Sequence, residues 1–125
     1  MWIKYIKDEQ GIEVIRVYGQ TPDISLPGTI EGCPVIGIYN YCFSGKNKTS
    51  CIEGSKLIKY GADTDGQTVQ KKDLYDELQR EIDTGIVTDV AGDFLEEIVI
   101  PDGIKKIGDY CFYQCRKLHT ISLGP

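Results

Sequence analysis

The chain has 125 residues and a mass of 14.0 kDa, which is close to the commonest size of a single domain. Its formal net charge is −5, so it lacks the excess of basic residues that binds nucleic acid without sequence preference. No apolar run approaches the roughly 20 residues of a membrane-spanning helix. We therefore expect one domain that binds no nucleic acid and does not insert into a membrane.

The N-terminal residues, MWIKYIKDEQGIEVIRVYG, alternate apolar and charged side chains and lack the continuous apolar core of a signal peptide. As encoded, the chain is expected to stay in the cytoplasm. Two β-rich runs within Lys4–Gly19 flank the polar stretch Asp8 to Gly11, which predicts a β-hairpin. We expect this hairpin, within residues 1–22, to cover the first unit of the repeats described next.

A repeated pattern occupies residues 23–45 and residues 94–125. LEEIVIP (Leu95–Pro101) aligns with LHTISLGP (Leu118–Pro125) at an offset of 23 residues, and DISLP (Asp23–Pro27) is a third copy. The second half of the unit also recurs, because IGDYCF near residue 110 aligns with IYNYCF at an offset of 69 residues. An offset of three times 23 indicates a true internal repeat, whose coils bury apolar surface only by stacking.

Each repeat unit is expected to begin with a short strand. Ile98-Val99-Ile100 is β-branched, Pro101 cannot donate a hydrogen bond, and Asp102-Gly103 favours a turn. Ile104, Ile107 and Phe112 then point back to the interior. The pattern predicts a parallel strand ladder, with a column of Ile and Leu residues and a column of Phe residues.

The C-terminal unit, LEEIVIPDGIKKIGDYCFYQCRKLHTISL, resembles the BspA-type leucine-rich repeat, and DISLPGTIEGCPVIGIYNYCFSG resembles the opening repeat of such arrays. The resemblance implies an α+β fold: a short leucine-rich-repeat solenoid with a parallel strand ladder, an N-terminal hairpin cap and one inserted helix. It also implies adhesion or protein binding, often at a cell surface. A secreted or surface location is therefore the alternative to the cytoplasm.

Residues 46–93 interrupt the repeats. Within them, Leu74, Leu78 and Ile82 follow one another at four-residue spacing, which predicts a helix over Lys71–Ile82, ending by about residue 84. Gly85 is a suitable stop signal. The helix is expected to be an insertion packed against the repeats, and the alternative is an added docking surface.

The cysteines and the single histidine are expected to serve packing and not chemistry. Five cysteines cannot all pair, so mostly free thiols are expected. The family resemblance places Cys42 and Cys111 at small, buried positions. Cys111, Cys115 and His119 share a helical spacing, but the segment is short and interrupted, and a structural zinc site takes four ligands. We expect no metal, no cofactor and no catalytic residue, and hence no enzyme.

Alternate residues of the predicted strands face outward on the ladder and form the expected site of protein–protein recognition or adhesion. These six residues are Asp23, Ser25, Glu97, Val99, Thr120 and Ser122. The alternative is a structural module. The last coil stops just after Ser122-Leu123 without a cap, which suggests either a fragment of a longer array or a homo-oligomer formed through the C-terminal end.

Overall fold

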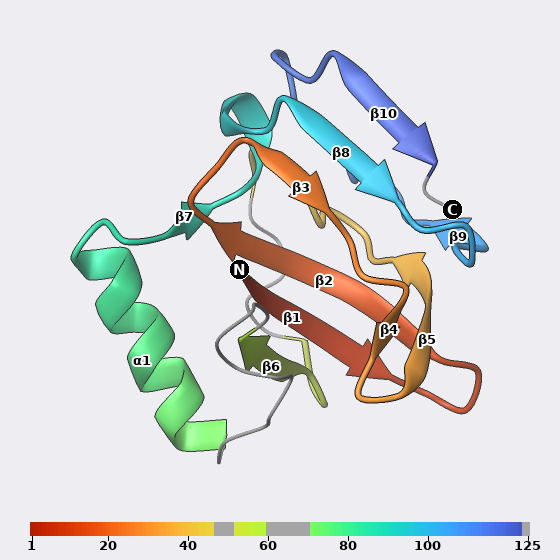
Figure 1. Ribbon diagram of the computed structural model, residues 1–125, viewed down its shortest axis with the longest axis horizontal. Helices are drawn as coiled ribbons and strands as arrows, with labels where there is room; N and C mark the ends of the chain where they lie inside the picture. Colours follow the sequence, from red (N-terminus) through yellow and green to blue (C-terminus); the bar gives the residue numbers. More distant parts are fainter. Residues whose placement is uncertain (47–51, 60–70, 124–125) are drawn as a thin grey trace.

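The computed structural model describes residues 1–46, 52–59 and 71–123 (Figure 1). In this part of the chain the strands are β1 (Trp2–Lys7), β2 (Ile12–Gly19), β3 (Asp23–Ser25), β4 (Thr29–Ile30), β5 (Cys33–Ile38), β6 (Lys56–Lys59), β7 (Thr88–Asp89), β8 (Glu97–Ile100), β9 (Lys106–Ile107) and β10 (Thr120–Leu123). The helix α1 spans Lys71–Asp83, and a short 3-10 helix spans Gly92–Phe94. Within these residues, no helix is long and apolar enough to cross a membrane.

The strands form two sheets. The larger sheet has the order β4-β5-β2-β1-β6, with β7 joined to β2 and β9 joined to β5. It is mixed, because β1 pairs antiparallel with β2 and β6, whereas β5 pairs parallel with β2 and β9. The smaller sheet, β10-β8-β3, is entirely parallel. Figure 1 shows α1 beside one edge of the large sheet and the small sheet at the opposite side.

The predicted leucine-rich-repeat solenoid is wrong as a description of the whole fold, although the α+β class holds. The dominant structure is the curled, mixed seven-stranded sheet with one helix. The physical reason is that the N-terminal hairpin supplies much of the core: Trp2, Ile3, Val14 and Val17 have no exposed surface. The three short parallel strands of the small sheet could not bury that much apolar surface by themselves.

The predicted hairpin forms, and it is part of the large sheet, where β2 pairs with β5 of the first repeat. β1 lies between β2 and β6, and β2 lies between β1 and β5, so both hairpin strands are interior strands of the large sheet. The turn is held by Asp8, whose carboxylate accepts hydrogen bonds from the backbone N–H groups of Gln10 and Gly11. Gly11 has a φ of 154°, and a Cβ there would lie 2.6 Å from the Pro34 carbonyl oxygen. The close approach of β5 to this turn therefore requires glycine.

Two buried clusters lie on opposite faces of the hairpin. The larger one joins the hairpin to the repeats through the side chains of Ile3, Val14, Ile38, Phe43 and Ile98, among others. The smaller one contains Trp2, Leu57, Leu74, Leu78 and Val87. Leu74 and Leu78 belong to α1, so the predicted helix forms, and its apolar side packs on the large sheet.

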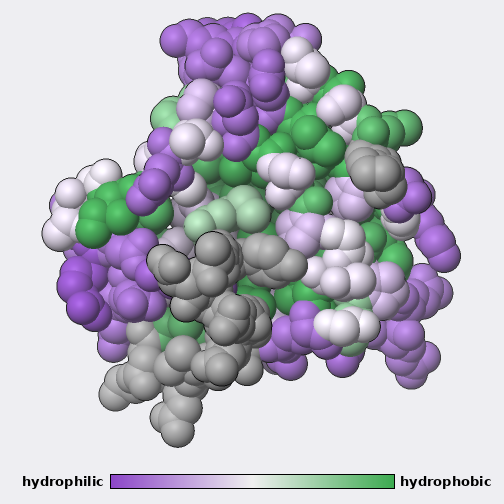
Figure 2. All heavy atoms as spheres, viewed as in Figure 1, coloured by the Kyte–Doolittle hydropathy of each residue, from purple (hydrophilic) through white to green (hydrophobic). Residues whose placement is uncertain are grey.

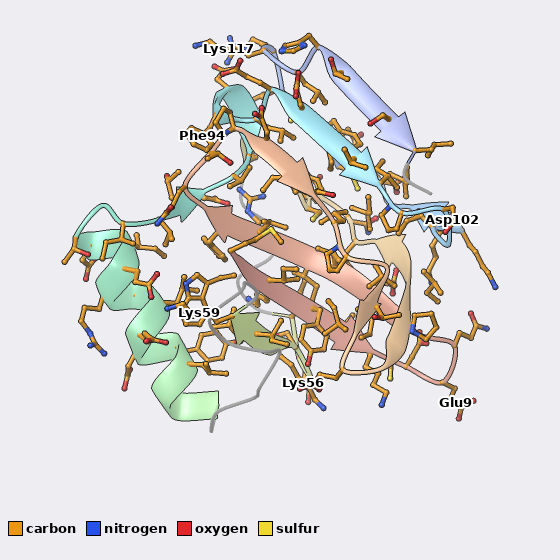
Figure 3. All side chains as sticks on the ribbon, in the orientation of Figure 1. Glu9, Lys56, Lys59, Phe94, Asp102 and Lys117 are labelled. Atoms are coloured by element: carbon orange, nitrogen blue, oxygen red, sulfur yellow. The ribbon has the colours of Figure 1, made fainter. Side chains whose placement is uncertain are left out.

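Polar contacts at the helix–sheet boundary centre on Glu81 of α1. Its carboxylate accepts a hydrogen bond of 3.1 Å from the Trp2 indole nitrogen and forms an ion pair of 2.9 Å with Lys59 Nζ. Lys59 also lies 5.2 Å from the centre of the Trp2 ring (labelled in Figure 3). Burial alone would raise the pKa of Glu81, but the hydrogen bonds from Lys59 and Trp2 outweigh it, so the pKa is lowered.

Replacing Glu81 with Gln should reduce the stability of the helix–sheet contact in a pH-dependent way. Because the pKa of Glu81 is lower in the folded chain, its ionised form stabilises the fold above the unfolded pKa of about 4.3. That contribution is lost as the pH falls through the folded pKa. Thermal melts between pH 3 and pH 7 should show E81Q below wild type at pH 7, with the difference shrinking toward pH 3. A constant difference across this range would contradict the role given to the carboxylate.

Candidate functional site

The six residues predicted for recognition lie together on one face of the small sheet, called here the ladder face. Asp23, Glu97 and Thr120 are in register across β3, β8 and β10. Ser25, Val99 and Ser122 form a second row in the same register. Glu97 and Val99 are half-buried, and the other four residues are exposed. The structure therefore joins residues that are up to 99 positions apart in the chain into one accessible patch.

The opposite side of the small sheet explains why these residues face outward. Ile24 and Ile98, which alternate with them, are buried in the main core. Strand residues point alternately to the two faces of a sheet, so anchoring the isoleucines directs their neighbours to solvent. The third strand is less well anchored, because Ile121 is 53% exposed.

Backbone hydrogen bonds continue the ladder beyond the strand ends. The Pro22 carbonyl accepts from Glu96 N–H, and the Glu96 carbonyl accepts from His119 N–H. At the other end, Leu26 N–H donates to the Val99 carbonyl. These hydrogen bonds extend the register of the three strands past their ends. Figure 2 shows strongly hydrophilic residues at the top of the view, near the starts of β8 and β10, and a mixture of apolar and weakly polar residues over the rest of the small sheet, whereas the surface of α1 is mainly hydrophilic.

Charged residues line one end of the ladder face. Asp23 and Glu97 lie in the row nearest the strand starts. Beside them, His119 Nε2 lies 3.9 Å from a Glu96 carboxylate oxygen, and its Nδ1 lies 2.9 Å from the Thr120 hydroxyl. This end of the face is therefore rich in hydrogen-bond acceptors.

The cysteine thiols are directed into the coil interior. Cys111 donates a hydrogen bond of 2.9 Å to the Tyr39 carbonyl, and Cys115 donates one of 3.0 Å to the Phe43 carbonyl. Burial raises the pKa of both thiols, and that of Cys42 still more, so the reactive thiolate is disfavoured. Cys33, Cys42, Cys111 and Cys115 are free, and Cys51 lies outside the described residues. The thiols of Cys111 and Cys115 thus act as small packing groups that also donate hydrogen bonds to carbonyls.

The three residues weighed as a metal site are not brought together. Cys111 and Cys115 contact carbonyls of the preceding coil, whereas His119 is exposed beside Glu96 and Thr120. Among residues 1–46, 52–59 and 71–123, no group of three or more His, Cys, Asp or Glu side chains is placed to hold a metal ion.

A buried arginine was missed by reasoning from sequence. Arg16 of β2 is 1% exposed, and its guanidinium makes two contacts with the Asp89 carboxylate, at 2.8 Å and 2.6 Å. The same group donates to the carbonyls of Tyr41 and Cys42, at 2.8 Å and 3.2 Å. Arg16 therefore ties the hairpin to the turn of the first repeat. The only sequence signal was a charged residue, one of two in β2 with Glu13, among mostly apolar residues, and such a residue usually marks a solvent-facing position.

The two matched halves of the repeat stack on each other as the 69-residue offset requires. The rings of Tyr41 and Tyr110 lie 5.3 Å apart, and those of Phe43 and Phe112 lie 5.7 Å apart with only 4° between their planes. Both pairs are separated by 69 residues in the sequence. Ile38 also pairs with Ile107 between β5 and β9.

Comparison with known proteins agrees with this repeat geometry. Residues 91–125 match the family model described as BspA type Leucine rich repeat region (6 copies). The resemblance seen in the sequence is confirmed for this C-terminal unit. No curated protein and no solved structure matches the chain. The BspA-type match covers β8, β9 and β10, so it includes four of the six residues of the ladder face.

Proposed function

We propose that the chain is a non-catalytic repeat module that binds another protein through the ladder face. The observation that carries this proposal is the register of Asp23, Glu97 and Thr120 beside Ser25, Val99 and Ser122. Small hydroxyl side chains, one central valine and two carboxylates make a flat surface with both apolar contact and hydrogen-bonding groups. Such a surface suits a macromolecule better than a small ligand, which is usually held in a concave pocket. The BspA-type match is consistent with a module of this kind.

The test is partner capture with matched charge changes. Glu97→Lys reverses a charge on the ladder face, and Ser25→Arg adds a positive charge and bulk there. Both variants are expected to lower capture of the partner protein at least tenfold. Glu9→Lys makes the same charge change in the exposed hairpin turn, far from that face (Figure 3), and should leave capture unchanged. Melting temperatures should stay close to wild type in all three variants. Equal capture by E97K, S25R and E9K would refute the assignment of the ladder face.

A second candidate function is assembly through the C-terminal end. Leu123 is 79% exposed and Ile121 and Ile107 are about half exposed, although the corresponding residues of the preceding coil are buried. β10 is also an edge strand of the small sheet. Exposed apolar residues beside an unpaired strand edge favour pairing with another polypeptide. Light scattering measures the average molar mass over a concentration series. A mass that rises with concentration indicates self-association, whereas a constant monomer mass favours binding to a different protein.

A further inference from the structure

Two buried cysteines occupy equivalent positions in neighbouring coils of the repeat. The first coil is residues 23–45, and the second coil is residues 95–117. Cys42 of the first coil and Cys111 of the second coil are related by the 69-residue offset. Both side chains are buried, and neither belongs to the ladder face. What the pair can do chemically therefore depends on how close the coils bring the two thiols.

The backbone holds these two cysteines side by side. The Tyr41 N–H donates to the Asp109 carbonyl at 3.0 Å, and the Phe43 N–H donates to the Cys111 carbonyl at 2.9 Å. These hydrogen bonds flank Cys42 and set it in register with Cys111. Residues in register on adjacent extended segments lie about 4.8 Å apart. Disulfides join Cα atoms that are about 4.4–6.8 Å apart, so the spacing of the coils suits a disulfide.

A shared acceptor places the Cys111 sulfur next to Cys42. The Cys111 thiol donates to the Tyr39 carbonyl oxygen at 2.9 Å, and the Cys42 backbone N–H donates to the same oxygen at 3.2 Å. Just before Cys111 in the chain, Gly108 lies so close to Asn40 that an added Cβ would collide with it. The two coils are thus in close contact beside the pair.

The thiol of Cys115 is directed elsewhere. It donates to the Phe43 carbonyl oxygen at 3.0 Å, and this oxygen also accepts from the Gly92 N–H at 2.9 Å. The Cys115 sulfur therefore lies beside the start of the 3-10 helix. Among the three thiols at this contact between the coils, Cys42 and Cys111 are the pair best placed to be joined.

We propose that Cys42 and Cys111 form a disulfide under oxidising conditions, called here the coil clasp. The clasp joins two chain segments that are separated by residues 46–93, which interrupt the repeats. It stabilises the contact between the coils by restricting the unfolded chain. This inference is independent of binding at the ladder face, which contains neither cysteine.

The reaction is thiol–disulfide exchange with a small disulfide or a disulfide oxidoreductase as the oxidant. The Cys111 thiolate attacks one sulfur of the oxidant, forms a mixed disulfide and releases one thiolate. The Cys42 thiolate then attacks the Cys111 sulfur and releases the second thiolate. The pair loses two electrons and two protons, and the oxidant is reduced to two thiols.

The surroundings of the two thiols assign the order of these steps. Burial raises the pKa of both thiols, and the neighbouring Cys111 raises the pKa of Cys42 further. Hydrogen bonds from the backbone N–H groups of Cys42, Gly108 and Tyr41 act against burial and lower the pKa of Cys111. Cys111 is therefore the more readily ionised thiol and takes the first step. Because both thiols are enclosed, the clasp should form faster while the coils dock during folding than in the folded chain.

The test is to refold the complete chain in a mixture of oxidised and reduced glutathione and to map its peptides by mass spectrometry. Most molecules are expected to lose two hydrogen atoms and to contain Cys42 linked to Cys111. The link should raise the melting temperature by about 8 °C over the same protein after reduction. Cys42→Ala and Cys111→Ala should lose both the link and this shift. The matched control Cys115→Ala should keep both.

Three results would overturn the coil clasp. The first is a refolded chain whose Cys42 and Cys111 thiols both stay free in this mixture. The second is a main link that involves Cys115. The third is a Cys42–Cys111 link that forms equally well in concentrated urea, because its formation would then not depend on the stacked coils. If Cys42→Ala does not fold, loss of the temperature shift in Cys111→Ala supports the clasp, and retention of the shift refutes it.

Discussion

Replacing Arg16 with Met is expected to lower the free energy of unfolding by about 3 kcal/mol. The guanidinium is 1% exposed and satisfies Asp89 together with the carbonyls of Tyr41 and Cys42. Met fills a similar volume but donates no hydrogen bond, so the Cys42 carbonyl and the Asp89 carboxylate lose the guanidinium, while the Tyr41 carbonyl still accepts from the Ser44 N–H. Asp89 is 36% exposed and can be partly rehydrated, which places the expected loss at the lower end of the range for broken buried pairs. Urea unfolding followed by circular dichroism measures the change.

The matched controls for this prediction are Asp89→Asn and the double variant. Asp89→Asn leaves a buried cation without its counter-ion, so it should also be destabilising. In the double variant the unpaired charges are gone, so its loss should be smaller than the sum of the two single losses. Additive losses would show that Arg16 acts through the two carbonyls alone. A change below about 1 kcal/mol for R16M would contradict its role in joining the hairpin to the first coil.

The strand pairings of the small sheet could be predicted from the repeat alignment. Aligning Ile24, Ile98 and Ile121 in the sequence gives the same register that β3, β8 and β10 adopt. A repeat makes this possible because equivalent residues of stacked coils lie side by side. The positions of Glu97 and Val99 on the ladder face follow from that register and from the alternation of side chains along a strand.

The large sheet could not be predicted in the same way. The pairing of β1 with β6 joins residues near Trp2 to residues near Lys59, and neither segment belongs to the repeat. The pairing of β2 with β5 depends on the close approach at Gly11, which no local pattern reveals. The hairpin and the helix were predictable because turn residues and helical periodicity are local. How the hairpin and the helix pack together depends on contacts between residues far apart in the chain. No local sequence pattern predicts these contacts.

Arg16 shows a further limit of pattern reading. In IEVIRVYG the arginine occupies a position that alternates with Ile15 and Val17, and this pattern normally marks the solvent face of a strand. The structure buries it because Asp89, which is 73 residues away, supplies the counter-charge from β7. A charged residue in a mostly apolar strand therefore identifies a buried ion pair only when its partner is known.

Replacing Phe43 with Ala is expected to cost about 4 kcal/mol of unfolding free energy, and replacing Phe112 with Ala roughly half of that. The two rings stack on each other, yet Phe43 is completely buried, whereas Phe112 is partly exposed. Truncating Phe43 leaves a cavity between the coils, whereas truncating Phe112 removes packing from one side only.

Urea unfolding of both variants measures the difference. Because one ring is enclosed and the other is partly exposed, the Phe43→Ala variant should be the less stable of the two. Equal losses would show that the Phe112 ring is packed as fully as that of Phe43 and would contradict the asymmetry of the stacked pair.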